Sequence, residues 1–187
     1  MLFTSDTTDG LAVAATLVNT LRDGVDALES VADLDALLQV VSMSGERLGT
    51  QAEVDAVREI RERLRALWSA ADRAEAAALV NAILAETTTT PYLTKHDQLD
   101  WHLHMTEPTA PLAHRIGAEA AMGVLDLIRT DSLGRLKTCA ADDCAAVLVD
   151  LSRNSSKRYC DTGNCGNRAN VAAYRARRRE AGSAPEA

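Results

Sequence analysis

Four cysteines lie close together in one segment, and their spacing constrains this chain more than any other feature. They are the only cysteines in the 187 residues and follow the pattern C-x4-C, fifteen residues, then C-x4-C. Two close thiol pairs suit a tetrahedral metal ion, since each turn can present two sulfurs to it. Four thiolate ligands leave no open coordination position, which is typical of a structural site. We therefore predict one structural zinc ion held by Cys139, Cys144, Cys160 and Cys165.

Alternative roles for the four cysteines are less well supported. An iron–sulfur cluster also accepts four thiolates and is the main alternative to zinc. Disulfides are disfavoured because the N-terminus has neither the basic region nor the apolar run of a secretory signal. No stretch approaches the roughly 20 apolar residues that span a bilayer, so we expect no membrane contact and a cytoplasmic chain with reduced thiols. So short a segment would depend on its metal for folding, at on the order of 10 kcal/mol.

Charge is divided unevenly along the chain. Residues 135–180 carry ten basic and five acidic side chains, a net +5, so the rest of this −7 chain carries −12. A basic segment in an acidic chain is typical of a part that contacts nucleic acid. Three arginines spaced seven and four apart share one helical face, which suits the DNA backbone or major groove. The candidate contacts are Arg153, Lys157, Arg158, Arg168, Arg175, Arg178 and Arg179; the alternative is a solvated helix without a partner.

The predicted basic helix, residues 167–179, starts beside the fourth cysteine. Metal ligands commonly accept hydrogen bonds from neighbouring side chains, and we expect Asn167 to support the metal loop in this way. For Arg168, support of the loop and contact with DNA are equally open. Val171 and Tyr174 form an adjacent apolar stripe, which we expect to pack on the metal loops.

Hydrophobic periodicity predicts that the first 130 residues are mainly helical. Aromatic residues make up only 3%, so a core of Leu, Val, Ile and Ala is expected, which favours packed helices. Capping-box patterns begin two of the helices, at Ser30 and Thr50. Strand-forming residues occupy 92–95 and 99–105, and residues 96–98 between them could turn a hairpin. Helices are expected over residues 10–22, 30–41, 50–71, 74–85 and 112–129.

The run Cys165-Gly166-Asn167-Arg168 and its surroundings closely resemble the CGNR zinc-finger family. The resemblance covers about residues 131–180 and includes both cysteine pairs, Asp150, residues 152–154, Tyr159 and residues 174–178. In that family a helical domain called ABATE, described as a putative stress-induced transcription regulator, typically precedes the finger. Softer matches to it are Leu17-Val-Asn-Thr-Leu21 and Trp101-His-Leu-His104. The resemblance implies a bacterial transcription regulator that binds DNA.

Together these observations predict a mainly α protein with small β elements. A helical regulatory domain is expected over residues 1–130, and a treble-clef-like or ribbon-like four-cysteine zinc module with a terminal basic helix over 131–180. Residues 181–187 are expected to be a disordered tail. DNA is the expected partner, and a zinc-stabilised module for protein–protein contact is the competing hypothesis. No catalytic motif is recognisable, so we expect no enzyme.

The helical domain is larger than a zinc module needs for folding, which suggests a regulatory role. We expect it to hold a small-molecule effector in an apolar pocket lined by residues such as Leu17, Leu64, Trp68 and Trp101, with both tryptophans largely in the core. A homodimer stays open. His102 and His104 point to one side of a strand, as a metal pair would. No carboxylate or third histidine accompanies them at a suitable spacing, so we interpret them as half-exposed strand positions.

Overall fold

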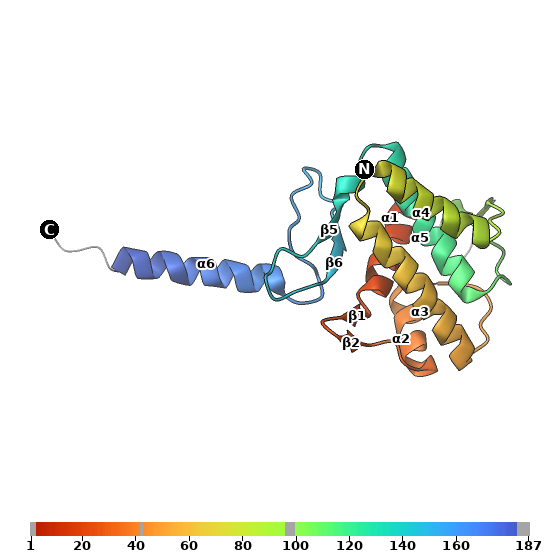
Figure 1. The fold of residues 1–187 in the computed structure, drawn as a ribbon, viewed down its shortest axis with the longest axis horizontal. Helices are drawn as coiled ribbons and strands as arrows, with labels where there is room; N and C mark the ends of the chain where they lie inside the picture. The colour runs from red at the N-terminus through yellow and green to blue at the C-terminus, as the bar shows by residue number, and fades with distance from the viewer. Residues whose placement is uncertain (1–2, 42, 96–99, 183–187) are drawn as a thin grey trace.

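The computed structural model describes residues 3–41, 43–95 and 100–182. Five helices form one body, and a sixth extends away from it as a single rod (Figure 1). The helices are α1 (Ser5–Val18), α2 (Val31–Val41), α3 (Gln51–Ala66), α4 (Arg73–Glu86), α5 (Leu112–Arg129) and α6 (Cys165–Gly182), with short 3-10 turns at η1 (Leu67–Ser69) and η2 (Leu133–Arg135). Antiparallel pairs join β1 (Leu21–Arg22) to β2 (Val25–Asp26), β3 (Tyr92–Thr94) to β4 (His102–His104), and β5 (Leu136–Thr138) to β6 (Val147–Val149). The mainly α prediction is confirmed.

Side-chain caps set where the helices begin. Thr50 accepts a hydrogen bond from the backbone N–H of Glu53, as its capping box predicts, and Asp72 caps α4 in the same way. Thr4 caps α1, so this helix begins at Ser5, five residues before the predicted start. The predicted strands at 92–95 and 99–105 pair over three residues each; the predicted turn at 96–98 lies outside the described residues.

The prediction that the first helix continues to Arg22 is wrong. The helix ends at Val18, and the chain forms the β1–β2 hairpin instead. Asp23 and Gly24 have φ values of 54° and 79°. Positive φ at both central residues belongs to a two-residue hairpin turn, for which Asp-Gly is a preferred sequence. The hairpin signal was therefore present, but the apolar spacing through Leu21 masked it.

The helical core is centred on the contact between α1 and α5. A Cβ atom at Gly10 would lie 2.3 Å from the carbonyl oxygen of Glu119, so only glycine lets the two backbones approach this closely. Gly123 faces α1 from the other helix with similarly little space. Aliphatic side chains from all five helices fill the surroundings; the largest fully buried ones include Leu11, Leu17, Leu34, Leu64, Ile83, Ile116 and Leu127.

Strand β6 belongs to two apolar clusters at once. Val147 and Val149 pack in the helical core, whereas Leu148, between them, packs with the cysteines. This follows from the alternation of side chains along a strand. The side chain of Asn19, at the C-terminal end of α1, donates to the carbonyl of Val147 and accepts from its N–H, both at 2.9 Å. The indole N–H of Trp68 donates to the Leu148 carbonyl at 3.1 Å. The helices and the cysteine segment are thus joined through β6.

Replacing Asn19 by alanine should destabilise this junction. Both polar groups of Val147 would lose their partner in a half-buried place, which typically costs about 1–3 kcal/mol. For a chain of this size that lowers the melting temperature by roughly 2–4 °C per kcal/mol. Asn170→Ala, an exposed change on α6, is the matched control for calorimetry. Equal melting temperatures for the two variants would contradict the proposed junction.

A buried ion pair supports the β1–β2 hairpin. The guanidinium of Arg61 is 3% exposed and donates to both carboxylate oxygens of Asp26, at 2.7 and 2.9 Å. These hydrogen bonds are the largest cause lowering the pKa of Asp26 from 3.8 to about 2. A carboxyl group with a depressed pKa in the folded state stabilises the fold above its unfolded pKa. That contribution is lost as the pH falls from about 4 through 2.

Acid titration of Asp26→Asn against the wild type should reveal this contribution. The wild type should be the more stable protein at neutral pH. The difference in the free energy of unfolding should shrink by about 2 kcal/mol between pH 5 and pH 2, at about 1.4 kcal/mol per pKa unit. Any acid release of metal affects both proteins alike, so the difference isolates Asp26. A difference that does not vary with pH would contradict this assignment.

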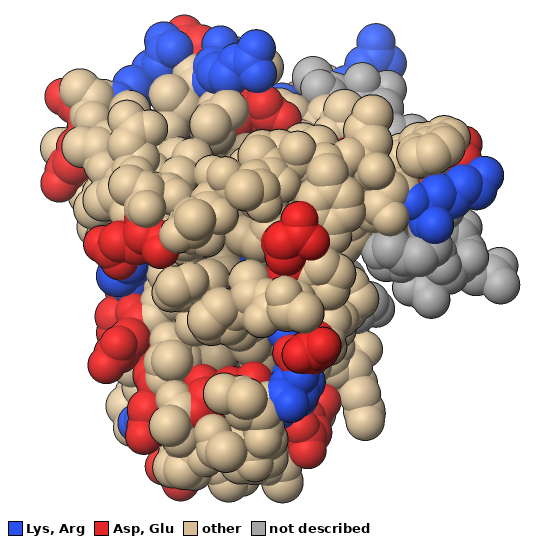
Figure 2. Space-filling model, turned by 90° about the vertical axis from the view of Figure 1, so that its right-hand side faces the viewer, with Lys and Arg blue, Asp and Glu red and all other residues tan. Residues whose placement is uncertain are grey.

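The surface of the helical body agrees with its acidic sequence. Figure 2 shows the face turned away from α6, over which acidic side chains are spread. Among the described helices, none is both long and apolar enough for a bilayer span.

Candidate metal centre

The sulfur atoms of the four cysteines form a cluster between the helical body and α6. All four Sγ atoms are within 4.8 Å of one another, and no two are joined in a disulfide. The Sγ atom of Cys160 lies 3.8 Å from that of Cys144 and 3.7 Å from that of Cys165. A tetrahedron of Zn–S bonds of about 2.3 Å has edges of about 3.8 Å. The sulfur positions therefore fit a single structural zinc ion, as the spacing predicts.

A β-hairpin and the start of a helix bring the two cysteine pairs together. Cys139 directly follows β5, and its backbone N–H donates to the Ala146 carbonyl at 2.8 Å. The loop carrying Cys160 is held to the first pair by the N–H of Ala140, which donates to the Arg158 carbonyl at 2.8 Å. Cys165 is the first residue of α6. The metal centre thus fixes the base of the basic helix.

Hydrogen-bond donors surround the sulfurs, as expected for thiolates. The hydroxyl of Thr162 lies 3.4 Å from the Sγ of Cys160, and the Cys160 N–H donates to the Sγ of Cys139 at 3.4 Å. Burial alone would raise the pKa of Cys160, but the donors, Thr162 first among them, lower it to about 6. Burial raises the pKa of Cys144. A divalent cation at the centre would favour the thiolate at every sulfur.

Arg168 reaches the metal centre directly. Its Nη2 lies 3.3 Å from the Sγ of Cys165, and its guanidinium forms a two-pronged ion pair with Asp143 at 2.6 and 3.0 Å. The hydrogen bond with Asp143 is the first cause raising the pKa of Arg168. Arg168 thus contacts both a metal-binding cysteine and the loop that carries Asp143, and its role in DNA contact stays a prediction. The side chain of Asn167, for which support of the metal loop was predicted, is exposed.

Asp150 organises the long loop between the cysteine pairs, a role that its residue type alone did not reveal. Its carboxylate is fully buried and accepts from Lys137 Nζ at 2.6 Å, the Lys157 N–H at 2.7 Å and the Ser152 hydroxyl at 2.5 Å. Burial opposes ionisation, but these donors, Lys137 first, lower the pKa of Asp150 to about 2. Lys157 also pairs with Asp161 at 2.6 Å. Two predicted DNA-contacting residues, Lys157 and Arg168, therefore form ion pairs within the module.

The remaining candidate residues extend into solvent. From residue 170 to 179 every side chain of α6 is exposed, and α6 projects away from the body (Figure 1). Among the described residues no ion pair engages the other five candidates, Arg153, Arg158, Arg175, Arg178 and Arg179. Val171 and Tyr174 are 40% and 55% exposed, so the prediction that they pack on the metal loops is wrong. Both residues lie more than one turn beyond Cys165, on the part of α6 that projects away from the body (Figure 1).

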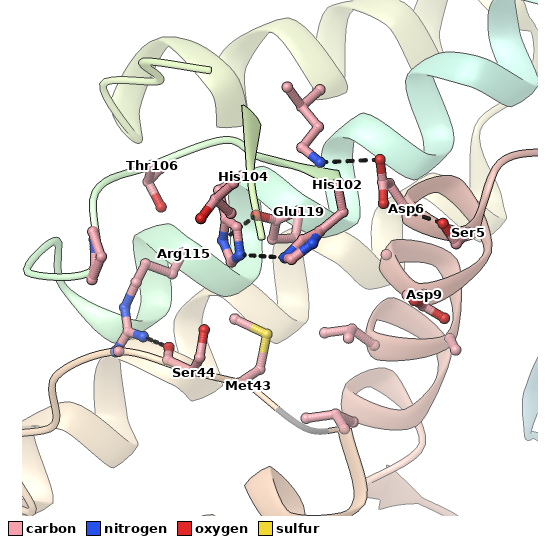
Figure 3. A pocket seen from close by; sticks show the side chains of 18 of the residues that line it. Ser5, Asp6, Asp9, Met43, Ser44, His102, His104, Thr106, Arg115 and Glu119 are labelled. Atoms are coloured by element: carbon pink, nitrogen blue, oxygen red, sulfur yellow. Dashed lines mark hydrogen bonds and ion pairs between the residues drawn. The ribbon is translucent and has the colours of Figure 1, made fainter. Parts of the chain in front are cut away.

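The helical body also contains a pocket of about 800 Å³ between α1, α5 and the β3–β4 hairpin (Figure 3). Its position differs from the predicted one. Trp101 lines it and is 69% exposed, so this tryptophan is not a core residue. Leu17 and Leu64 lie in the core, and Trp68 packs at β6. The polar lining residues include Asp6, Asp9, His102, His104, Arg115 and Glu119.

Two known family models match the chain. Residues 135–178 match the model of the CGNR zinc finger. Residues 11–150 match the model of the ABATE family, described as "Putative stress-induced transcription regulator". The matches overlap over β5 and β6, the hairpin through which the two clusters are joined. No curated protein matches the chain. The chain therefore belongs to the ABATE family, and its four cysteines form the zinc site of a CGNR finger.

Proposed function

We propose that this protein is a non-catalytic transcription regulator that binds DNA through α6. The observation that carries this proposal is the projecting helix itself. An 18-residue helix is about 27 Å long at 1.5 Å per residue, and the major groove of B-DNA admits a helix. Arg175, Arg178 and Arg179 line one side of this helix together with the smaller Val171. Such a face offers several phosphate contacts.

The metal centre supports this interpretation by fixing the base of α6. Most helices in proteins owe their stability to tertiary packing, and the exposed part of α6 has little of it. Here the first turn contains Cys165, and Arg168 ties it to Asp143. The arginines from 175 onward are thus presented at a defined angle to the body. The acidic helical body would be repelled by phosphate, so binding should be confined to the finger.

Binding of the full zinc-loaded chain to labelled genomic DNA fragments tests the proposal. We expect retention at about 50 mM salt and release at higher salt, because the phosphate contacts displace counterions. If the zinc-loaded chain retains no fragment even at low salt, DNA binding fails as a function. The exposed Val171 and Tyr174 then favour the competing function, contact with another protein.

We also propose that the helical domain senses a ligand in its pocket. Helix α1 lines the pocket through Asp6, Asp9 and Val13, and the side chain of Asn19 at its C-terminal end holds β6. A shift of α1 on ligand binding would therefore reach β6, whose Leu148 packs against the cysteines. This connection supports a regulatory role for the domain.

A further inference from the structure

The pocket of the helical domain combines carboxylates with apolar side chains. Asp6, Asp9 and Val13 are spaced three and four apart on α1, so one face of this helix presents both kinds of group to the pocket. Val41, at the end of α2, and Met43 extend the apolar part of the lining. The volume of about 800 Å³ lies in the range of small-molecule sites. Such a lining suits a ligand that has one charged group and an apolar part.

The two carboxylates on α1 are not neutralised by a cation. Asp6 accepts the backbone N–H of Leu103 at 3.2 Å, and the side chain of Asp9 is exposed. Within the described part of the chain, neither of them forms an ion pair. Asp100, which also lines the pocket, differs from them because it pairs with Lys95 at 2.9 Å. Uncompensated negative charge is therefore concentrated on the α1 side.

A guanidinium lines the opposite side of the pocket. Figure 3 shows Arg115 across the pocket from the carboxylates of α1. It donates to the carbonyl oxygens of Ser44, Glu46 and Ala110. These hydrogen bonds hold the guanidinium at the loop before α3 and the turn before α5. Its positive charge is thus kept away from the α1 side.

Two further groups in the lining respond to the negative charge. Burial raises the pKa of Glu119, with the charge of Asp6 adding to the effect and that of His102 opposing it. Burial also raises the pKa of Tyr92, and the charges of Glu107 and Glu119 add to it. Both shifts favour the uncharged form of the group. A cation placed in the pocket would interact favourably with the same charges.

Exposed apolar side chains also line the pocket. Trp101 is 69% exposed and Val40 is 73% exposed. Exposed apolar surface beside a cavity is typical of a place that a ligand covers. Tyr92 adds a second aromatic ring to the lining, and it stacks on His104 with ring centroids 5.7 Å apart. The faces of Trp and Tyr rings attract a positive charge, so the aromatic groups and the carboxylates favour the same kind of ligand.

We propose that the pocket binds an organic ammonium ion. Its charged nitrogen lies at Asp6 and Asp9, and its apolar part covers Val40, Met43 and Trp101. Charged hydrogen bonds to the carboxylates select the ammonium over neutral and anionic molecules of the same shape. This inference rests on the proposed ligand-sensing function and names the class of ligand.

Three probes that share one skeleton and differ in charge test this class of ligand. They are 4-phenylbutylamine, 4-phenylbutanol and 4-phenylbutyrate. At neutral pH the first is a cation, as a lysine side chain is, and the last is an anion. Calorimetric titration of the zinc-loaded full chain should show one amine bound per chain. The alcohol should bind at least about tenfold more weakly, the effect of losing a charged hydrogen bond, and the anion should bind more weakly still.

Removal of the two carboxylates should remove the preference for the amine. Asp6→Asn with Asp9→Asn keeps the side-chain shape and an oxygen that can accept the N–H of Leu103. The affinity for the amine should fall at least about tenfold, and that for the alcohol should not change. Asp55→Asn with Glu59→Gln, on α3 and outside the pocket lining, removes the same charge and is the matched control. This control should bind all three probes as the wild type does.

Tryptophan fluorescence supplies a second measurement if a variant folds poorly. The bound amine should cover Trp101, so the emission of the wild type should shift to shorter wavelength. Trp101→Phe should keep amine binding and lose this shift, because Trp68 lies at β6 and not in the pocket lining. A shift of the same size in Trp101→Phe would contradict the proposed position of the ligand.

The outcomes separate the class of ligand from its regulatory effect. Equal or tighter binding of the alcohol or the anion would overturn the ammonium class and leave the pocket as a ligand site. Absence of amine binding at about 1 mM would also overturn it. DNA retention with and without the amine reports sensing, and Asp6→Asn with Asp9→Asn controls for direct effects of the amine on DNA. Amine binding without any change in retention would count against ligand sensing and not against the class of ligand.

Discussion

Replacing Cys160 by alanine should release the zinc ion and unfold the finger while helices α1–α5 survive. Cys160 is 6% exposed, and its sulfur is close to those of both Cys144 and Cys165. A structural zinc contributes roughly 10–16 kcal/mol to folding, whereas the apolar cluster around the cysteines is small. Zinc analysis should therefore fall from one ion per chain to none.

The boundary of this unfolding is a sharper test than the metal content. The sequence suggests loss of order after about residue 135, but Val147 and Val149 pack in the helical core. Hydrogen exchange should consequently become fast over residues 152–182 and stay slow in α1, α3 and α5. Strand β6 should exchange at an intermediate rate. Ser156→Ala, an exposed change in the same loop, is the control that should keep its zinc. Retention of zinc by Cys160→Ala, or collapse of all helices together, would contradict this expectation.

Changing Arg175 and Arg179 to alanine should flatten the salt dependence of DNA binding by about two units. Each phosphate contact contributes about −0.9 to the slope of log K against log salt. Arg168 and Lys157 are held by Asp143 and Asp161, so the candidates that remain are the five arginines without an ion pair in the described part of the chain. If about four of them reach phosphates, the wild-type slope should be roughly −3 to −4. The double variant should show roughly −2 and keep its zinc.

A matched control distinguishes the effect of losing contacts made by α6 from the effect of lowering the net charge of the protein. Arg73→Ala with Arg129→Ala removes the same charge from the helical body, at two exposed positions on α4 and α5. Its slope should equal that of the wild type. An arginine that reads a base would behave differently, since its loss should also reduce discrimination between sites by about 1–3 kcal/mol. If both double variants show the same slope change, α6 is not the DNA-contacting element.

Local sequence signals were enough to predict the metal centre and most of the helices. Zinc ligands occur in close pairs because a turn of a few residues can place two sulfurs on one ion, so spacing suffices. The capping box at Thr50 gave the start of α3 correctly, and the apolar period gave α5 correctly, because both signals act within a few residues of each other. The predicted end of the longest helix at residue 71 is wrong, since α3 ends at Ala66 and the chain continues as the 3-10 turn η1. The β1–β2 hairpin was missed although its signal is equally local, since an apolar helical pattern overlapped the Asp-Gly turn.

The pairing of distant polar residues, in contrast, depends on how the chain packs. Asn19 meets Val147, and Glu119 meets His104, although the sequence separates the first two by 128 residues. Arg168 and Arg175 look alike in sequence, yet within the described residues only Arg168 contacts a carboxylate, because Asp143 lies beside the first turn of α6. Side-chain types and periods carry no information about such distant partners. The partners of these polar side chains are set by how α1 packs on α5 and by how β6 joins the helical core to the cysteine cluster. Both depend on tertiary packing and not on local conformational preference.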